Sequence, residues 1–329
     1  MTRVLVTGAG GYIGSVLTRM FLERGDQVVA VDRFFFGRDT LPPEGNGLRV
    51  VEADIRHLET ESFSGVDAVI DLAALSNDPS GELDPELTWS INCRGRVRVA
   101  RLAKRAGVQR YILPSSCSIY GFQEGVLDET SPVNPLTTYA KANFEAEQQV
   151  LPLADEEYCV VVIRQATVYG LSHRMRFDLA INGMVKGFFR NGRIPILRDG
   201  TQWRPFIHVR DASRAMLMLL EASAAPVNGQ IFNVGSDDQN VQIMPLAKVV
   251  AEAIGAPFEY EWYGDPDHRS YRVSFEKIRG TLGFHAECAP ADGAAEVYRA
   301  LQSGQWKADD PRTITVQWYK KLMSDGVNL

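Results

Sequence analysis

The stretch Gly8-Ala9-Gly10-Gly11-Tyr12-Ile13-Gly14 follows directly on an apolar run, Arg3–Thr7, and opens a longer segment, Tyr12–Arg24, with apolar residues at every third and fourth position. An unbroken apolar run is typical of a parallel strand buried on both faces, and the second spacing is typical of a helix. The glycines at positions 8, 11 and 14 permit a tight turn and a close backbone approach, so that a pyrophosphate can rest on the N–H groups that open the helix. The stretch therefore predicts the first strand–turn–helix unit of a dinucleotide-binding fold.

An acidic residue closes the next expected strand. Gln27–Val31 is followed at once by Asp32, and a carboxylate there accepts hydrogen bonds from the adenosine ribose hydroxyls and repels a 2′-phosphate. Arg33 and Arg38 lie close by and could weaken that preference. A purely structural turn with a surface aspartate is the alternative, but the flanking strand and helix favour a binding site. The sequence predicts NAD as the cofactor.

Apolar runs and amphipathic segments continue to alternate along the first half of the chain. This alternation predicts an α/β fold, a Rossmann-type doubly wound parallel sheet with right-handed crossovers. After Gly170 the order becomes irregular, which predicts a smaller mixed α/β substrate-binding cap. Further expected strands are Leu48–Glu52, Ala68–Leu72, Arg110–Pro114, Tyr158–Arg164, Pro205–Val209 and Gln230–Val234, and further expected helices are Glu86–Ala106, Leu136–Ala154, Phe177–Arg190, Asp211–Glu221 and Met244–Ile254.

Length and composition limit the classes of protein to consider. The chain has 329 residues, enough for about two domains, and no Pro/Gly-rich linker divides it. We assign residues 1–170 and about 205–240 to the NAD-binding domain, and about 171–204 and 241–329 to the cap. A net charge of −6 argues against nucleic-acid binding. Four scattered cysteines argue against a metal site and, with no signal peptide or membrane span in the sequence, predict a cytoplasmic protein.

Several motifs together resemble the extended short-chain dehydrogenase/reductase superfamily, in particular its NAD-dependent nucleotide-sugar epimerase/dehydratase group, the group of UDP-galactose 4-epimerase. The resemblance runs along nearly the whole chain. It implies that Asp54 and Ile55 flank the adenine, and that Leu72, Ala73 and Ala74 pass beside the pyrophosphate. The motifs are the glycine turn with Thr7, Ala53-Asp54-Ile55-Arg56, Leu72-Ala73-Ala74, Ser115-Ser116-Cys117-Ser118-Ile119-Tyr120-Gly121, Tyr139-Ala140-Lys141 and Gly200-Thr201-Gln202-Trp203-Arg204-Pro205-Phe206-Ile207-His208-Val209-Arg210-Asp211.

The same resemblance implies a catalytic pair. Ser116 and Tyr139 would bind one sugar hydroxyl, and Tyr139, as phenolate, would remove its proton. A phenol has a pKa near 10 in water, so a base at neutral pH needs positive charge nearby. The family supplies this charge with a lysine four residues after the tyrosine, where this chain has Asn143. Lys141 is two residues on and points to nearly the opposite side of the helix.

Asn143 leaves three interpretations open. The chain is an enzyme with weakened or re-tuned oxidation chemistry, an ordinary enzyme carrying a single substitution, or a protein that binds without catalysis. Because Ser116 and Tyr139 are present, we favour the first two. On this view Asn143→Lys raises the oxidation rate, and Asn143 itself faces the nicotinamide ribose.

The resemblance also implies a substrate side. Arg204 and Arg269 correspond to arginines that clasp a diphosphate, with Arg272 as a rival to Arg269. Asn182 corresponds to an asparagine at the nucleotide end, and Ser118 and Thr167 neighbour the sugar. Arg174 and Arg176 face either the sugar or the solvent.

The positions that carry an Asp-Glu pair in 4,6-dehydratases are Cys117 and Ser118 here, which argues against that elimination. A buried, unreactive Cys117 is the commoner case.

We therefore expect an NAD-dependent nucleotide-sugar epimerase that acts by transient oxidation, at C4 by analogy with the family, to a keto-sugar. The alternatives are a dehydrogenase or ketoreductase with net redox change, or a nucleotide-sugar-binding protein with weakened catalysis. The resemblance also implies a homodimer formed by the helices Glu86–Ala106 and Leu136–Ala154. A solvated outer face is the alternative for these helices, because it would carry Arg94, Arg96, Arg98, Glu145 and Glu147.

Overall fold

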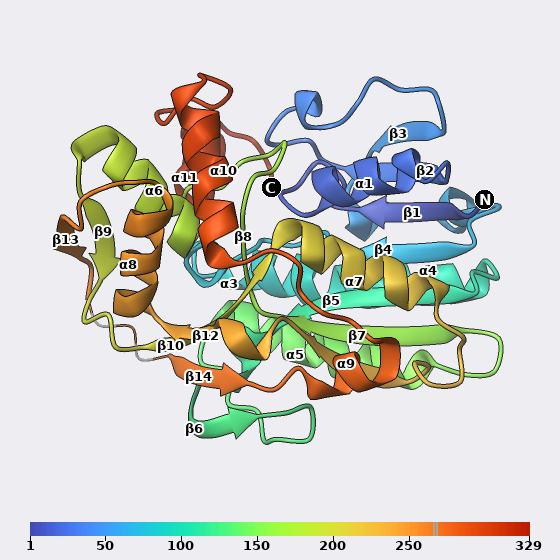
Figure 1. The fold of residues 1–329 in the computed structure, drawn as a ribbon. Coiled ribbons are helices and arrows are strands. Elements are labelled where there is room, and N and C mark those ends of the chain that lie inside the picture. Colours follow the sequence, from blue (N-terminus) through green and yellow to red (C-terminus); the bar gives the residue numbers. More distant parts are fainter. Residues whose placement is uncertain (266, 268) are drawn as a thin grey trace.

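Seven parallel strands form the main sheet of the computed structural model, which describes every residue except Pro266 and His268 (Figure 1). Each pair of neighbours runs parallel, as the unbroken apolar runs predict. In spatial order the strands are β11 (Gln230–Val234), β7 (Cys159–Gln165), β5 (Arg110–Ser116), β4 (Ala68–Asp71), β1 (Arg3–Thr7), β2 (Gln27–Asp32) and β3 (Leu48–Glu52).

The strand order reverses between β1 and β4. Val6 of β1 pairs with Ala30 of β2 on one side and with Ile70 of β4 on the other. Chain connections leave such a point in opposite directions, which opens a crevice at the carboxyl ends of the two strands. The glycine turn and Leu72-Ala73-Ala74 follow these strands and therefore meet at the crevice.

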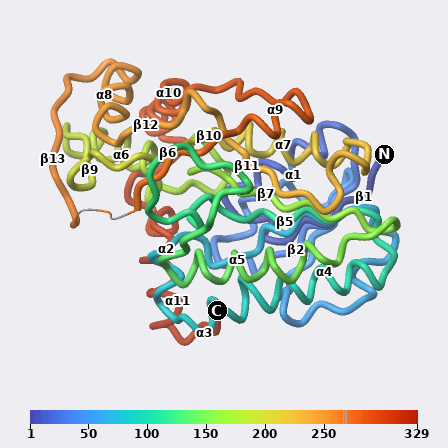
Figure 2. The backbone as a smooth tube through the Cα atoms, turned by 90° about the horizontal axis from the view of Figure 1, so that it is seen from below, coloured from blue at the N-terminus to red at the C-terminus, as the bar shows by residue number. Residues whose placement is uncertain are grey.

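Helices cover both faces of the sheet (Figure 2). The helices α1 (Gly14–Glu23) and α7 (Val209–Glu221) pack together on one face, and α4 (Arg96–Arg105) and α5 (Thr138–Val150) pack together on the other. The expected helix Glu86–Ala106 is interrupted: α3 (Pro85–Trp89) leads into a π-helical turn, Ser90–Gly95, before α4 begins. In that turn the Asn92 amide accepts from the backbone N–H of Leu75 and donates to its carbonyl, at 2.8 and 3.1 Å.

The cap is a mixed α/β unit beside the carboxyl end of the sheet. A three-stranded sheet joins the cap to the main body, and the helices α6, α8 and α10 pack against one another. No helix of the described residues is long and apolar enough to cross a membrane. The cap elements are α6 (Ala180–Asn191), α8 (Ile243–Ala253), α10 (Pro290–Gln302), α11 (Thr315–Ser324), β8 (Thr167–Tyr169), β10 (Trp203–His208), β12 (Asn240–Gln242) and the parallel pair β9 (Ile194–Leu197) and β13 (Tyr260–Tyr263).

Short elements complete the fold. Within the segment 264–272, for which the sequence suggests only a polar loop, residues from Ser270 onward form a strand, β14 (Ser270–Val273), that pairs with β6 (Phe122–Leu127). A one-turn helix, α2 (Asp78–Gly81), and α9 (Glu276–Leu282) lie in connections.

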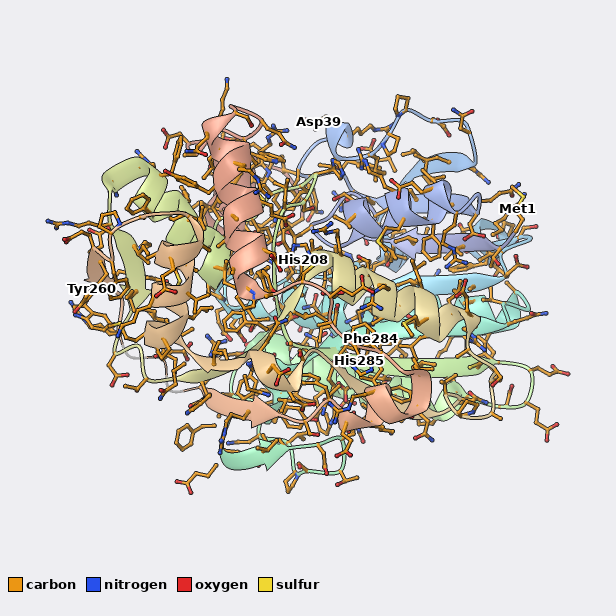
Figure 3. The ribbon with its side chains drawn as sticks, viewed as in Figure 1. Met1, Asp39, His208, Tyr260, Phe284 and His285 are labelled. Carbon is orange, nitrogen blue, oxygen red and sulfur yellow. The ribbon has the colours of Figure 1, made fainter. Side chains whose placement is uncertain are left out.

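His208, marked in Figure 3, fixes α10 to the end of β10. Its ring is fully buried, and Nδ1 accepts the backbone N–H of Arg210, which caps α7. The proton is therefore on Nε2, which lies 2.5 Å from the carboxylate of Glu296 on α10. Because His208 also caps α7, which packs on one face of the main sheet, this contact joins α10 of the cap to the main body.

Candidate active site

A cavity of about 960 Å³ lies at the carboxyl ends of the central strands, between the sheet and the cap. Its wall includes the glycine turn, the ends of β2 and β4, Ser116 and Tyr139, and cap segments that carry Arg204 and Arg269. This volume is near the top of the ~300–1,000 Å³ range of ligand pockets. The cavity thus connects the expected cofactor residues with the expected substrate residues.

The glycine turn fits closely against the end of β4. Gly8 has a φ of +65°, and a Cβ there would lie 2.8 Å from the backbone nitrogen of Ala73. A Cβ on Gly14 would overlap the carbonyl oxygen of Gly8. Both positions thus require glycine, which leaves backbone N–H groups at the start of α1 accessible to a phosphate.

The residues around Asp32 favour an unphosphorylated ribose. Its carboxylate lines the cavity and accepts the backbone N–H groups of Gly10 and Phe34 at 2.9 and 2.7 Å. Arg33 is held by Asp54 at 2.8 Å, and Arg38 is paired with Glu52. Of the two arginines, Arg33 lines the cavity and Arg38 does not.

Asp54 is a strongly held carboxylate in the cavity wall. Burial acts to raise its pKa, but hydrogen bonds from Arg56 and Arg33 outweigh burial and lower it to about 2. Asp54 and the neighbouring Ile55 line the cavity, where the sequence places the adenine.

Aromatic residues far apart in the sequence also line the cavity, and the sequence gives no motif for them. Tyr319 of α11 is buried against Phe35 and Phe36, with ring centroids 6.3 and 5.5 Å apart. The guanidinium of Arg174 lies 3.6 Å from the centroid of Phe36. Arg174 thus contributes to the buried cavity wall and is not a solvent-facing residue.

The ends of β5 and α5 bring Ser116 and Tyr139 together at the cavity wall. Ser116 closes β5 and accepts the backbone N–H of Ser118, and Tyr139 lies in the first turn of α5, which Thr137 caps. Ser116 is also among the groups that lower the pKa of the Tyr139 phenol. The structure thus brings the predicted pair to one wall of the cavity.

A buried polar network supports this pair from behind. Glu147 of α5 accepts hydrogen bonds from Ser115 and from Arg164 of β7, the latter at 2.9 Å. Arg164 also donates to the Tyr120 hydroxyl at 3.0 Å. Cys117 is buried in the same loop, and burial raises the pKa of its thiol, as expected for an unreactive cysteine.

Opposing charges act on Tyr139. Burial raises the pKa of its phenol, and the negative charge of Asp78 raises it further. The positive charges of Arg96 and Arg176 and the hydrogen bond with Ser116 lower the pKa, although the net shift without ligands is upward. A role as base therefore depends on positive charge near Tyr139.

Asn143 is buried and does not line the cavity, contrary to the expectation that it faces a ribose. Its Oδ1 accepts a hydrogen bond of 2.8 Å from Arg96, and its Nδ2 donates to the carbonyl of Tyr139 at 2.9 Å. The suggestion that Arg96 and Glu147 belong to a solvated outer face is also wrong, because both are buried. Lys141 is exposed, on the other side of the helix, as its spacing predicts.

The two expected diphosphate-binding arginines lie together in the cavity wall. Arg204 and Arg269 are both bonded to Asp267 at 2.7 Å, and Arg269 also pairs with Asp78. Arg272 does not line this cavity, and its guanidinium lies 5.2 Å from the ring centroid of Trp203. Of the two rivals, the structure thus places Arg269 at the site.

Unpaired polar atoms mark the middle of the cavity. The hydroxyl of Ser118 and the side-chain carbonyls of Gln165 and Gln202 are buried and have no hydrogen-bond partner among the residues that the structure describes. All three residues line the cavity, together with Thr167 and the ion pair of Arg176 with Asp178. Buried polar atoms without partners are costly, so these atoms are suited to a hydroxylated ligand. Gln165 and the pairing of Arg176 with Asp178 are not among the contacts expected from the sequence.

Asn182 lies behind the cavity wall and does not line it. Its Oδ1 accepts the backbone N–H of Gly170 at 3.0 Å, and its Nδ2 donates to the Tyr12 hydroxyl and the Arg176 carbonyl. These bonds engage both ends of the fully buried amide. The structure therefore gives Asn182 a supporting position, in place of the expected ligand contact.

Comparison with known proteins places the chain in a family. Residues 4–235 match the model of the NAD dependent epimerase/dehydratase family. A UDP-glucose 4-epimerase of Mycolicibacterium smegmatis is 31% identical over 309 residues, which cover 89% of this chain and 96% of that protein. A UDP-glucuronate 4-epimerase of Thermodesulfobacterium geofontis is 27% identical and covers 88% of this chain and 93% of its own length.

Solved structures share the fold over nearly the whole chain. MoeE5 in complex with UDP-glucuronic acid and NAD has a TM-score of 0.82 and 29% identity, over 92% of this chain and 99% of its own. The dTDP-glucose 4,6-dehydratase DesIV of Streptomyces venezuelae, also with NAD, has a TM-score of 0.83 and 25% identity, over 93% and 99%. The predicted Rossmann-type fold, enzyme class and NAD dependence are thereby confirmed at the level of the family. The chain belongs to the NAD dependent epimerase/dehydratase family.

Proposed function

We propose that this protein epimerises a nucleoside-diphosphate sugar through transient oxidation of one ring carbon, C4 by analogy with the 4-epimerases that it resembles. The observation that carries the proposal is that one cavity brings Ser116 and Tyr139 together with the glycine turn and with the arginines Arg204 and Arg269. A nucleotide sugar joined to its nucleotide by a diphosphate has the length and charge to reach from Arg204 and Arg269 to this pair.

Different residues of the cavity would bind the diphosphate, bind the sugar and transfer the proton. Arg204 and Arg269 hold the diphosphate, and Ser118, Gln165 and Thr167 offer hydrogen bonds to the sugar. Ser116 orients the hydroxyl to be oxidised, and Tyr139 accepts its proton as the carbon–oxygen bond becomes a carbonyl. When bound, NAD accepts a hydride from that carbon and returns it. After the keto-sugar has turned over, Tyr139 gives the proton back, which produces the opposite configuration with no net redox change.

The cover over the adenine end supports epimerisation in preference to net redox chemistry. Tyr319 and Leu329 line the cavity and pack beside Phe35 and Phe36. An enzyme with net redox change must exchange its cofactor in every turnover, whereas an epimerase can retain it. Gly8, Gly11 and Gly14 would hold the pyrophosphate, with Tyr12 and Ile13 in the same turn, Asp32 at the ribose, and Asp54 and Ile55 at the adenine.

The test is product analysis with UDP-sugars, dTDP-glucose and their 4-epimers, run in deuterium oxide. Epimerisation by hydride return predicts an epimeric product without deuterium on the ring and without accumulation of reduced cofactor. Tyr139→Phe should lower kcat by about 10²–10⁴-fold, because the proton transfer is lost. Stoichiometric reduced cofactor with an oxidised sugar would instead establish a dehydrogenase, and solvent deuterium in a 4-keto-6-deoxy product a dehydratase. Binding of every sugar without conversion would establish the silent alternative that Asn143 raises.

A further inference from the structure

Arg96 is a positive charge in the interior of the protein. Only 1% of the residue is exposed, and its guanidinium donates hydrogen bonds to Asn143 Oδ1 and to the carbonyls of Asp71 and Pro114. Its Nε has no hydrogen-bond partner and lies 3.8 Å from Asp71 Oδ2. A buried arginine is costly unless the site uses its charge or its hydrogen bonds.

The contacts of Arg96 connect it to both segments that carry the catalytic pair. Asn143 lies one helical turn after Tyr139, and its amide joins Arg96 to the backbone carbonyl of Tyr139. Pro114 lies two residues before Ser116 on β5. The guanidinium thus contacts the strand that ends in Ser116 and, through Asn143, the helical turn that carries Tyr139, and Arg96 does not itself line the cavity.

We propose that Arg96, held by Asn143, is a positioning residue that supplies the positive charge for the Tyr139 phenolate. Asn143 on α5 carries no charge. The positive charge comes instead from Arg96, on the neighbouring helix α4. The inference rests on the proposed role of Tyr139 as the base, and it assigns a function to Asn143 as the link between the two helices.

The other charges near Tyr139 do not replace Arg96. Asp78 of α2 is negative but paired with Arg269, and Arg176 is paired with Asp178 at 3.0 Å. Asp71 of β4 faces Arg96 and receives hydrogen bonds from Thr7 and Tyr111. Burial raises the pKa of Asp71, and the positive charge of Arg96 acts in the opposite direction. Arg96 and Arg176 are the two arginines whose charges lower the pKa of Tyr139. Of the two, Arg96 has the longer ion-pair distance, 3.8 Å to Asp71 against 3.0 Å from Arg176 to Asp178.

A titration of Tyr139 tests the proposal without a sugar substrate. The NAD-loaded protein is prepared with ring-carbon-labelled tyrosine, and the NMR signal that Tyr139→Phe removes identifies Tyr139. In Arg96→Gln the pKa of Tyr139 should rise by about one unit or more, because an opposite charge nearby has been removed. Arg96→Lys keeps the charge and should leave the pKa close to that of the wild type. Arg98→Gln is the matched control, since Arg98 lies on the same helix and donates to the carbonyl of Leu58.

A second variant covers the case in which Arg96→Gln does not fold. Asn143→Asp keeps the shape of the side chain and its bond to Arg96, but its carboxylate neutralises the cation, so the pKa of Tyr139 should again rise. For any sugar that is turned over, the acid limb of the kcat profile should move to higher pH by the same amount. A pKa of Tyr139 that is unchanged in Arg96→Gln, or in Asn143→Asp, overturns the proposal. A shifted pKa in a protein that converts no sugar would sustain this inference and refute the proposed function.

Discussion

The side-chain amide of Asn143 is buried in contact with the guanidinium of Arg96. Asn143→Lys would place an ammonium at hydrogen-bond distance from Arg96, whose only nearby carboxylate among the described residues is Asp71. The sequence alone predicts that this substitution raises the oxidation rate, and the structure adds an expected cost in stability. We expect a loss of about 3–5 kcal/mol in the free energy of unfolding, because a second buried charge has no partner.

Urea denaturation of Asn143→Lys measures this loss, with Gln148→Lys as the control. Gln148 is exposed on the same helix, so a lysine there should change stability by less than about 0.5 kcal/mol. Adding Arg96→Gln to Asn143→Lys should recover most of the lost stability, since it removes one of the two cations. Equal stability of Asn143→Lys and the wild type would show that the guanidinium of Arg96 does not lie against residue 143.

The carboxylate of Asp54 makes the folded state sensitive to acid. Its pKa in the folded protein is about 2, below the value of about 3.9 in an unfolded chain. Because the folded-state pKa is depressed, the stabilisation is complete above pH ~4 and is lost as the pH falls toward 2. We expect it to reach about 2 kcal/mol. Unfolding measured at about pH 5 and about pH 3 should show a smaller difference in Asp54→Asn, and an unchanged difference would contradict the assignment.

At the scale of elements, α11 covers one end of the cavity through Tyr319. Tyr319→Ala should remove the packing with Phe35 and Phe36, lower the free energy of unfolding by about 3–5 kcal/mol and speed the release of NAD. Tyr319→Phe keeps the ring and is the matched control, with release and stability near those of the wild type. The rate is measured by loading the purified protein with the reduced cofactor and following the change in its fluorescence when an excess of NAD displaces it. Equal release rates in Tyr319→Ala and Tyr319→Phe would mean that α11 does not retain the cofactor.

Elements formed by local pattern are the ones that the sequence predicts well. The expected strands Arg3–Thr7, Leu48–Glu52 and Gln230–Val234 have the bounds that the structure shows, because each is a short apolar run with a turn at its end. The π-helical turn Ser90–Gly95 has no such local signal, since Asn92 forms it while bonded to Leu75 in another segment. The turn directly precedes Arg96 and sets where α4 begins. The burial of Arg96 therefore has no local signal in the sequence either.

At the scale of the whole molecule, the same contrast separates two groups of site residues. The glycine turn, Ser116 and Tyr139 lie in contiguous motifs, and the sequence identifies them. The cover formed by Tyr319 and Phe36, and the arginine pairing through Asp267, join segments that are distant in the chain. Such contacts depend on how the cap docks on the sheet, which no spacing in the sequence specifies.

The outer surface of α4 and α5 is where we predict that two copies of the chain meet. The two helices lie side by side on one face of the sheet (Figure 2), and Lys141 and Gln148 are exposed on α5. A two-fold interface uses the same surface of both copies, so Lys141→Glu would bring two new carboxylates into it, each one helical turn from Glu145 of its own chain, and weaken the dimer. Lys248→Glu on α8 makes the same change of charge at an exposed site away from this face and should leave the mass unchanged. Analytical ultracentrifugation should give a dimer for the wild type and for Lys248→Glu and a larger monomer fraction for Lys141→Glu, whereas a monomeric wild type would refute the prediction.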